Sequence, residues 1–418
     1  MRFKRTLALM LSCFTLCSPS AYAATAEFTI DSDKFYVSDS GITKHDLEAA
    51  PYIENSRTMV PVRAVSESFG AEVSWDEASQ KVIIKDKDIT VELSIDSDIA
   101  YVNGEAVMLD SPAVINNNRT MIPLRFVSEA LGKNVEYVAT TKQILISDEQ
   151  PVFTVNGIPV TVEDFRSYLY YGGYEYSDED ISQVVLQTTN TLLEGFVFSD
   201  EFKKNNLVAV PYASSGDVQT IMSLKDEIYK DVLVAPIIKI YEAIMDTSMY
   251  FEHAGFYPSE QEIIDYYNSN YVRAKHVLVL AESDADKKNA KKEAEKILAL
   301  AKKGEDFDKL VESYGEDPGM AESPEGYVFT YGEMVPEFEK ATFGLEEGEI
   351  SDIVETAYGY HIIKKESLPE LSGGDVAYLS EVIFSVKYGE KAEELFNTAD
   401  VQVNYDLETL ISKLKPVQ

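Results

Sequence analysis

The chain has 418 residues, and its 45% hydrophobic and 26% charged content is that of a folded globular protein rather than a disordered or membrane-embedded chain. Its length exceeds one ordinary hydrophobic core, so two to four domains are expected. The formal net charge of −35 argues against nucleic acid and anionic membrane surfaces as partners, because like charges repel, and is compatible with basic or unfolded polypeptides.

The N-terminus has the pattern of a secretory signal peptide. Three basic residues among the first five precede an apolar run over residues 7–17, and Ala21-Tyr22-Ala23 is an A-x-A cleavage signal. We therefore expect residues 1–23 to be removed near Ala23 and the mature protein to act outside the cytoplasm. A retained anchor is one alternative, although the apolar run is shorter than a bilayer-spanning helix. Lipidation of Cys13 is another, with a poor lipobox before it.

An internal repeat dominates the first third of the chain. Residues 57–70, beginning Arg-Thr-Met-Val-Pro, recur 62 positions later as residues 119–132, beginning Arg-Thr-Met-Ile-Pro. Each copy predicts a short strand followed by a helix that begins near its proline and ends at its glycine. Alternating apolar residues after each helix predict further strands. We expect residues 24–148 to form a repeated strand/helix domain.

This region resembles the copper amine oxidase N-terminal-like domain that many secreted bacterial proteins carry. The resemblance implies no copper here, since a copper site needs clustered imidazoles or thiolates, whereas the region has one histidine, His45, and no cysteine. We expect His45 to be a loop residue. The domain is expected to be an accessory module that contacts the cell wall rather than a catalytic one.

Residues 149–271 predict a mainly helical domain. The segment 152–161 alternates apolar residues around Asn156-Gly157, a pair typical of a hairpin turn, and Thr161 is positioned to cap the helix that follows. Apolar and aromatic residues then recur at helical spacing up to about Asn270. A Val-Asn-Gly hairpin before such a helix resembles the opening of the chaperone domain of secreted parvulin foldases.

Two of the four histidines lie in strand-like runs, Lys275-His276-Val277 and Tyr360-His361-Ile362. Between them lie Glu316-Asp317-Pro318 and the segment 332–338. In order and spacing these motifs resemble the parvulin family of peptidyl-prolyl cis/trans isomerases over residues 272–367. The resemblance implies a compact domain with a four-stranded antiparallel sheet and flanking helices. The fold class expected for the whole chain is therefore multidomain α+β.

The resemblance also implies which side chains form the site. Those assigned to the catalytic centre are His276, Asp317 and His361, and those assigned to the pocket that grips the prolyl ring are Met334, Phe338 and Phe343. Rotation about an Xaa-Pro bond needs no covalent chemistry, so an apolar cup and a few polar groups suffice. No cofactor and no metal are expected.

Alternatives are open for each of these groups. The two histidines could only hydrogen-bond each other and fix the sheet. The aspartate could be an ordinary turn residue, because Pro318 follows it. Two of the pocket residues, Met334 and Phe338, lie four positions apart, which is also the spacing of a helix core, and the two roles are compatible.

One segment departs from the family pattern. Parvulins usually have Gly-Gly-Asp-Leu-Gly and an aromatic residue before the pocket methionine, whereas this chain has Ser323–Phe329, without the glycine pair and the pocket leucine. Tyr327 or Val328 is expected to fill the gap. The departure keeps open a second hypothesis, in which a holdase chaperone or a cell-wall-associated binding protein carries a degenerate isomerase domain.

Residues 368–418 are expected to form a C-terminal tail with a helix from Tyr388 and a short strand at Asp400–Asn404. In the foldases that the motifs resemble, such tails fold back on the helical domain, which makes the isomerase domain an insertion. The leading hypothesis is an exported peptidyl-prolyl cis/trans isomerase and foldase that assists the folding of secreted polypeptides. No nucleic-acid partner is expected, and the sequence leaves the oligomeric state open.

Overall fold

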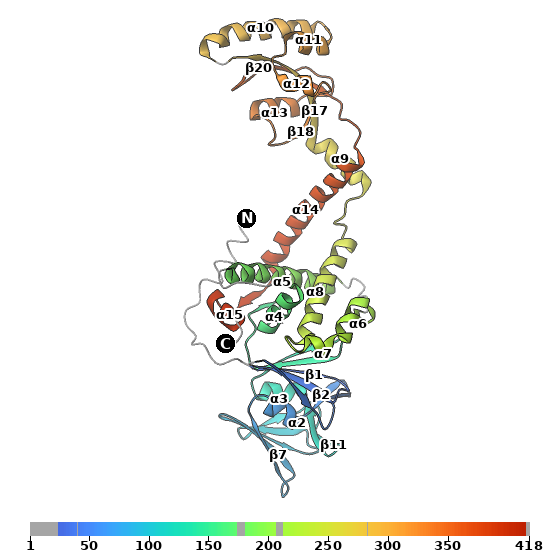
Figure 1. Cartoon of the computed structure of the whole chain (residues 1–418), viewed down its shortest axis with the longest axis vertical. Coiled ribbons are helices and arrows are strands. Elements are labelled where there is room, and N and C mark those ends of the chain that lie inside the picture. Colours follow the sequence, from blue (N-terminus) through green and yellow to red (C-terminus); the bar gives the residue numbers. More distant parts are fainter. Residues whose placement is uncertain (1–23, 40, 174–179, 206–211, 282, 415–418) are drawn as a thin grey trace. The chain divides into compact units, whose positions relative to one another are not determined.

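The structure, a computed structural model, describes residues 24–39, 41–173, 180–205, 212–281 and 283–414 (Figure 1). The predicted signal peptide, with its cleavage site at Ala23, lies outside the described residues. The chain forms two compact units: the first ends at Ala254 and takes in Lys391–Gln418, and the second is Gly255–Glu390. Among the described residues, no helix has both the length and the apolar character needed to cross a bilayer.

The first unit begins with three antiparallel sheets. Their strand orders are β13-β14-β1-β2-β3, β10-β9-β8-β7-β6 and β11-β12-β5-β4. The strands are β1 (Thr25–Thr29), β2 (Lys34–Ser38), β3 (Ile42–Asp46), β4 (Tyr52–Glu54), β5 (Arg57–Pro61), β6 (Glu72–Asp76), β7 (Lys81–Asp86), β8 (Ile89–Ser94), β9 (Ile99–Val102), β10 (Glu105–Met108), β11 (Val114–Asn116), β12 (Arg119–Pro123), β13 (Asn134–Val138) and β14 (Gln143–Ser147).

The two copies of the sequence repeat form equivalent strand–helix units. Their strands β5 and β12 pair with each other, so the copies meet along equivalent residues. The helices α2 (Val62–Glu67) and α3 (Leu124–Ala130) each begin directly after a proline, whose fixed φ suits the start of a helix. Gly70 and Gly132 then take φ of 79° and 65°, which strain other residues. The expected repeated strand/helix domain is confirmed.

A hairpin of β15 (Phe153–Val155) and β16 (Ile158–Val160) leads into the helical part of the first unit. Its turn residues Asn156 and Gly157 have φ of 51° and 83°. Thr161 caps the next helix through a capping box with Asp164. The helices are α4 (Val162–Tyr171), α5 (Ile181–Lys204), α6 (Gly216–Ser223), α7 (Lys225–Ile228) and α8 (Val234–His253).

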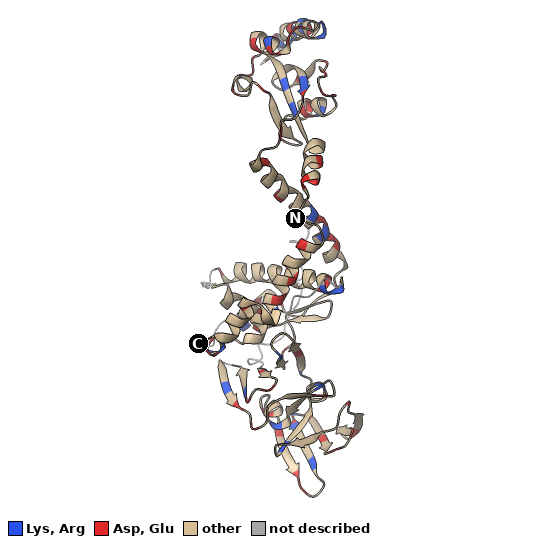
Figure 2. Ribbon diagram, turned by 90° about the vertical axis from the view of Figure 1, so that its right-hand side faces the viewer, with Lys and Arg blue, Asp and Glu red and all other residues tan. Residues whose placement is uncertain are grey.

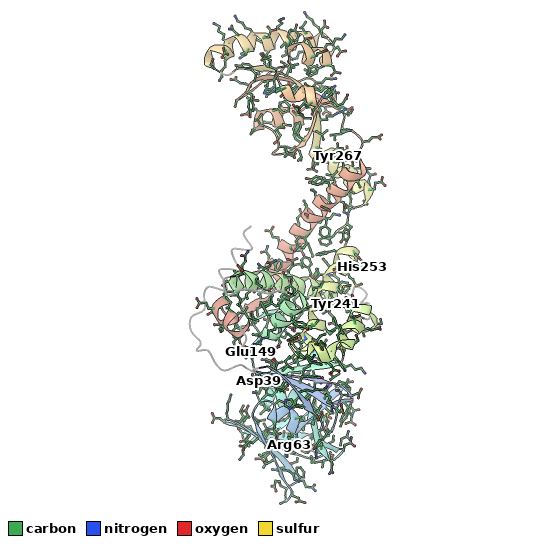
Figure 3. The ribbon with its side chains drawn as sticks, in the orientation of Figure 1. Asp39, Arg63, Glu149, Tyr241, His253 and Tyr267 are labelled. Atoms are coloured by element: carbon green, nitrogen blue, oxygen red, sulfur yellow. The ribbon has the colours of Figure 1, made fainter. Side chains whose placement is uncertain are left out.

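The C-terminal tail returns to this helical part. Its strand β21 (Val401–Val403) pairs antiparallel with β15, and its helix α15 (Leu407–Leu414) packs on α4 and α5. Glu149, labelled in Figure 3, accepts a hydrogen bond from the Tyr405 hydroxyl at 3.3 Å and pairs with the Lys413 ammonium at 2.5 Å. The tail therefore forms one compact unit with residues that precede the isomerase-like stretch.

A buried polar cluster joins the strand-rich and helical parts of the first unit. Glu27 on β1 is 1% exposed and accepts hydrogen bonds from the Gln143 amide, the Tyr229 hydroxyl and, at 3.0 Å, the backbone N–H of Ala235 in α8. Tyr36 stacks on the Tyr229 ring beside it. Burial, only partly offset by these donors, raises the pKa of Glu27 from 4.5 to about 7.

The sheet of the second unit has the order β18-β17-β20-β19 and is antiparallel throughout, as expected. Its strands are β17 (Tyr271–Leu280), β18 (Tyr327–Thr330), β19 (Val354–Thr356) and β20 (Gly359–Glu366). Alternate side chains face opposite sides, so two separate cores form. The helices α10 (Asp284–Lys302) and α11 (Phe307–Tyr314) cover one side, and α13 (Pro336–Phe343) covers the other.

Two further helices extend this unit beyond the stretch that resembles parvulins. The helix α9 (Glu260–Asn270) and the first part of α14 (Gly373–Thr398) share a small core that includes Tyr267 and Leu379 (Figure 3). The helix α14 thus begins well before Tyr388, where the sequence pattern suggested a helix, because its first turns already bury apolar side chains. Acidic and basic residues occur along both units (Figure 2).

Candidate active site

Two neighbouring strands bring His276 and His361 together. In the register of β17 and β20, His276 lies opposite Ile363 and His361 opposite Leu278, so the two imidazoles are diagonal neighbours on one face. Their Nδ1 atoms are 2.9 Å apart and their rings stack with centroids 5.1 Å apart. Each histidine is 4% exposed. The pairing is therefore fixed by strand register.

Asp317 approaches the same cluster from a loop. The backbone N–H of Glu316 donates to the Leu278 carbonyl at 2.9 Å, which ties this loop to β17. Asp317 then caps the short helix α12 (Pro318–Glu322), where its Oδ1 accepts from the Gly319 N–H at 3.0 Å. Its Oδ2 lies 2.7 Å from His276 Nε2. Asp317 is thus a turn residue and a member of the cluster at once.

Two members of the cluster are hydroxyl residues that the predicted site did not include. Thr356, at the end of β19, has its Oγ1 2.8 Å from His361 Nε2. Tyr327, at the start of β18, donates its hydroxyl to Asp317 Oδ2 at 2.8 Å. The contact of Thr356 with His361 can be inferred only once the pairing of β19 with β20 is known. Tyr327 lies in the segment that departs from the family motif, so the motif gives no role for it.

The charge state of the cluster follows from burial and hydrogen bonding. Burial lowers the pKa of both imidazoles, and with the nearby His276 it takes the pKa of His361 to about 4. Burial opposes ionisation of Asp317, but hydrogen bonds from His276 and Tyr327 outweigh it, and the pKa of the carboxyl is lowered. At neutral pH the cluster is therefore an aspartate beside two neutral imidazoles.

These charge states fix the direction of every hydrogen bond in the cluster. An ionised carboxylate only accepts, so His276 must carry its proton on Nε2 and donate to Asp317. Its Nδ1 is then an acceptor for the Nδ1–H of His361, and His361 Nε2 accepts from the Thr356 hydroxyl. The result is one continuous chain of donors directed from Thr356 to Asp317.

A cluster of apolar side chains packs against the imidazole pair. Phe338, 3% exposed on α13, presents its ring at steep angles to both imidazoles, with centroids 5.1 and 5.4 Å away. Met334 and Phe343 are partly buried in the same cluster, and Phe343 packs edge-on against Phe329 at 6.1 Å. The six residues predicted for the site therefore lie together: three polar groups beside three apolar side chains.

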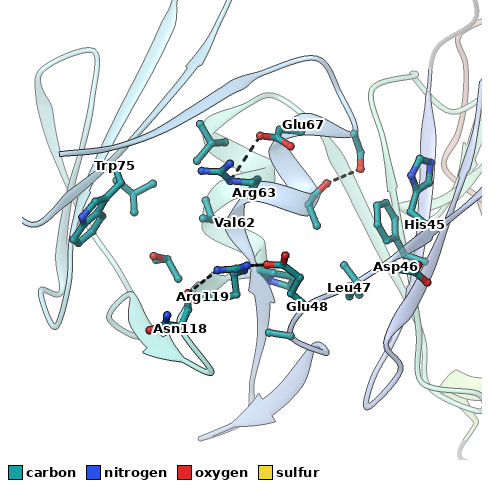
Figure 4. Close-up of a pocket in the computed structure, with 18 of the residues that line it drawn as sticks. His45, Asp46, Leu47, Glu48, Val62, Arg63, Glu67, Trp75, Asn118 and Arg119 are labelled. Atoms are coloured by element: carbon teal, nitrogen blue, oxygen red, sulfur yellow. Dashed lines mark hydrogen bonds and ion pairs between the residues drawn. The ribbon is translucent and has the colours of Figure 1, made fainter. Parts of the chain in front are cut away.

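A separate cavity of about 980 Å³ lies in the repeat domain of the first unit. Figure 4 shows Trp75 on one wall and His45 on another, with Arg63 and Glu67 of α2 between them. Arg63 pairs with Glu67 at 3.8 Å, and Arg119 pairs with Glu48. The cavity thus combines an indole, two guanidinium–carboxylate pairs and buried apolar side chains.

The expectation that His45 is a loop residue is wrong. It lies within β3, opposite Phe35 of β2, and its ring stacks on that phenylalanine at 4.9 Å. A strand of exposed polar residues at a sheet edge carries little apolar periodicity, which is why the pattern suggested a loop. His45 also hydrogen-bonds with Thr43 at 2.8 Å, so the single imidazole of the repeat domain does not fit a copper centre.

Two regions of the chain match models of known domain families. Residues 276–367 match the PPIC-type PPIASE domain, and residues 25–146 match the copper amine oxidase N-terminal domain. The foldase protein PrsA of Geobacillus kaustophilus is 37% identical over 175 residues, which are 37% of this chain and 56% of that protein. The chain thus spans about half the length of this relative.

Other matches are longer and more distant. The foldase protein PrsA of Oceanobacillus iheyensis is 28% identical over 293 residues, or 66% of this chain and 87% of that protein. A crystal structure of the peptidylprolyl isomerase PrsA from Bacillus cereus is 23% identical, covers 61% of this chain and 87% of that one, and has a TM-score of 0.26.

Proposed function

We propose that this PrsA-like protein, which combines a PPIC-type isomerase domain with a copper amine oxidase N-terminal domain, is an exported peptidyl-prolyl cis/trans isomerase and foldase. The observation that carries the proposal is the imidazole–aspartate cluster beside a cluster of apolar side chains. The substrates are Xaa-Pro bonds of unfolded or partly folded polypeptides, as the foldase names of the relatives suggest.

The geometry suits a reaction that breaks no bond. Rotation about the Xaa-Pro amide has a barrier of about 18–20 kcal/mol, because resonance must be lost. Phe338, Met334 and Phe343 would hold the prolyl ring, and the polar cluster would stabilise the twisted amide in a partly dry site. The chain of fixed hydrogen bonds keeps those dipoles oriented before the substrate arrives, so little reorganisation is needed.

The first test is isomerisation of an unphosphorylated Xaa-Pro peptide by the full chain and by Asp317→Ala. Loss of a hydrogen bond to a charged group costs about 1.5–3 kcal/mol, so the variant should lose about 10- to 150-fold in kcat/KM. The matched control is Asp352→Ala, which removes a carboxylate that is 89% exposed and should change nothing. No acceleration by the folded wild-type chain would overturn the proposal.

The holdase alternative is tested in the same preparation. A chain that only shelters unfolded clients would suppress their aggregation equally well with and without Asp317, and would not accelerate isomerisation. A foldase that both isomerises Xaa-Pro bonds and suppresses aggregation should lose only the isomerisation in Asp317→Ala. The altered segment Ser323–Phe329 motivated this alternative, but its strand β18 pairs normally with β17 and brings Tyr327 to Asp317.

Export follows from the signal peptide expected at residues 1–23, and action outside the cytoplasm fits the foldase relatives. Intact-mass measurement of the protein recovered from the culture medium or envelope tests the expected cleavage near Ala23. A chain beginning at Ala24 supports the assignment, whereas a lipid-modified mass would support the Cys13 alternative. A full-length mass in the membrane fraction would support a retained anchor.

We also propose cell-wall contact through the repeat domain, for which the cavity in Figure 4 is the supporting observation. An exposed indole and paired Arg and Glu side chains are suited to the flat faces and hydroxyl groups of wall glycan. Trp75 is the chain's single tryptophan and is 43% exposed, so its fluorescence reports on this cavity. Saturable change on titration with soluble peptidoglycan fragments, weakened in Arg119→Leu, would support contact, and an unchanged spectrum would refute it.

A further inference from the structure

Tyr327 makes a contact that the family motif does not supply. In this chain it stands within the run Ser323–Phe329, where parvulins usually have glycines and a leucine. Its hydroxyl donates to Asp317 Oδ2 at 2.8 Å, the same oxygen that His276 Nε2 approaches at 2.7 Å. With the Gly319 N–H on Oδ1, the carboxylate has three donors.

The backbone holds the tyrosine in this position. Tyr327 begins β18 and lies opposite Ala274 of β17. The preceding Gly326 has φ of 99°, and a Cβ there would come within 2.8 Å of the Ala274 carbonyl oxygen. Only a glycine at position 326 therefore lets the strand start so close to β17 and direct the next side chain toward Asp317.

Gly319 provides the space for the hydroxyl. A Cβ at this position would lie 2.1 Å from the Tyr327 oxygen, which is well inside any tolerable contact. The backbone of Gly319 is not in the left-handed region, so its conformation does not require glycine. The Tyr327 hydroxyl therefore occupies space that is free only because residue 319 is a glycine.

Asp317 decides the direction of the hydrogen-bond chain through both imidazoles. If the carboxyl were protonated, it could donate to His276 Nε2, and the proton positions on His276 and His361 would reverse. A donor fixed on Asp317 Oδ2 opposes that reversal because it stabilises the ionised form. Tyr327 is itself held protonated, since burial and the neighbouring carboxylate raise its pKa.

We propose that Tyr327 is a positioning residue for the isomerase site, which holds the Asp317 carboxylate in place and thereby fixes the tautomers of His276 and His361. This inference rests on the proposed isomerase function. Gly319 contributes to the same positioning, because it leaves room for the tyrosine hydroxyl. The segment that departs from the family motif then does not mark a degenerate site, but a different way of securing its aspartate.

The test compares wild type with Tyr327→Phe, which keeps the ring in the apolar cluster and removes only the hydroxyl. We expect kcat/KM to fall about tenfold, mostly through kcat, with the acid limb of its pH profile moved upward. The control Tyr257→Phe removes a hydroxyl from a side chain that is 59% exposed and should leave both unchanged. Equal activity and equal pH profiles in Tyr327→Phe would overturn the proposal.

A second measurement does not depend on turnover. In wild type, ¹⁵N shifts of the imidazoles should show His276 protonated on Nε2 and His361 on Nδ1, as the hydrogen-bond chain requires. Tyr327→Phe should show a mixture of tautomers. If neither the wild type nor any variant accelerates isomerisation, the proposed function fails. The ¹⁵N spectrum then still shows whether Tyr327 fixes the tautomers of His276 and His361. Unmixed tautomers in Tyr327→Phe would show that the ring is only part of the pocket wall.

A third, independent test uses Gly319, where an added side chain would occupy the place of the Tyr327 hydroxyl. Gly319→Ala should displace the hydroxyl and reproduce the loss seen in Tyr327→Phe. The double variant should then lose about as much as either single one, because both remove the same contact. Multiplicative losses in the double variant would contradict the proposal. If Gly319→Ala fails to fold by circular dichroism, the Tyr327→Phe arms decide alone.

Discussion

Each compact unit buries a cluster of titratable side chains, and the two clusters differ in what surrounds them. In the first unit, Glu27 is 1% exposed and its oxygens are taken by donors from the strand-rich and helical parts of the unit. In the second unit, the imidazoles are equally buried, but the Asp317 side chain is 22% exposed. The cluster around Glu27, here called the enclosed cluster, can only join parts of the protein. The cluster of His276, His361 and Asp317, here called the open cluster, has one partly exposed side chain and can also contact a ligand.

The electrostatic consequences have opposite signs. Burial raises the pKa of Glu27 to about 7, so the folded first unit binds more protons than the unfolded chain between pH 4.5 and 7. Burial lowers the pKa of His361 from 6.5 to about 4, so the folded second unit binds fewer protons in that range. Mild acid should therefore stabilise the first cluster and destabilise the second.

The largest expected effect comes from removing the aromatic ring that supports the open cluster. Phe338→Ala leaves a cavity beside both imidazoles, where the ring is 3% exposed, and should destabilise the second unit by about 3–5 kcal/mol. Urea denaturation followed by near-ultraviolet circular dichroism measures the loss. Tyr358→Ala, at a side chain that is 60% exposed, is the control. An unchanged midpoint in Phe338→Ala would mean that the ring is not part of the core.

The enclosed cluster should make the first unit less stable as pH rises. A shift from 4.5 to about 7 corresponds to about 3 kcal/mol of unfolding free energy lost between pH 4.5 and pH 8. Trp75 fluorescence follows the unfolding of this unit alone, because it holds the only tryptophan. Glu27→Gln should flatten the slope without abolishing it, since burial raises the pKa of Glu163 as well.

The control for this experiment is Glu54→Gln, at an exposed position of the same unit, which should keep the wild-type slope. A slope of the same steepness in Glu27→Gln would exclude Glu27 as its source. If the wild-type first unit instead becomes more stable between pH 4.5 and pH 8, the two clusters do not have opposite effects on the pH dependence of stability.

The open cluster should give the opposite slope. His361 contributes stability that is fully present above pH 6.5 and is lost as the pH falls through 4, by about 3 kcal/mol. Thermal unfolding of the second unit, followed by the nuclear magnetic resonance signals of its sheet residues, should shift to lower temperature over this range. His361→Leu should weaken that dependence without abolishing it, because burial lowers the pKa of His276 as well. His253→Leu, on the exposed end of α8, should keep the full dependence. A flat wild-type profile would contradict the neutral state assigned to His361.

The sequence predicted the open cluster better than the enclosed one. His276 and His361 lie in strand-like runs that are visible in the sequence, and the order of motifs in the parvulin-like region predicted that Asp317, Met334, Phe338 and Phe343 lie near them. Glu27 lies between apolar residues of a short strand, where an acidic side chain suggests a solvent-facing position. Its partners Gln143 and Tyr229 are 116 and 202 residues away, so no local pattern predicts the contact.

Thr356 and Tyr327 show the same limit inside the candidate active site. Thr356 reaches His361 because the short strand β19 turns into β20 at Gly359, and a hydroxyl at the end of a strand has no distinctive spacing. The sequence predicts Tyr327 or Val328 at the place of the missing pocket leucine, whereas the Tyr327 hydroxyl contacts Asp317, ten positions earlier, on the other side of α12. Periodicity predicts which face a side chain occupies, but a polar contact also depends on turn geometry and on the space left by glycines.

The smallest effect tests whether the end of the hydrogen-bond chain matters for the reaction. Thr356→Val keeps the shape of the side chain and removes the hydroxyl that donates to His361 Nε2 at 2.8 Å, so unfolding free energy should fall by about 1 kcal/mol. The control Thr330→Val removes a hydroxyl that bonds the Asn270 carbonyl at 2.7 Å, remote from the imidazoles. Both variants should lose similar stability. Only Thr356→Val should slow isomerisation, by a few-fold, because the tautomer of His361 is then no longer fixed from that side. Equal rates in the two variants would mean that Asp317 alone orients both imidazoles.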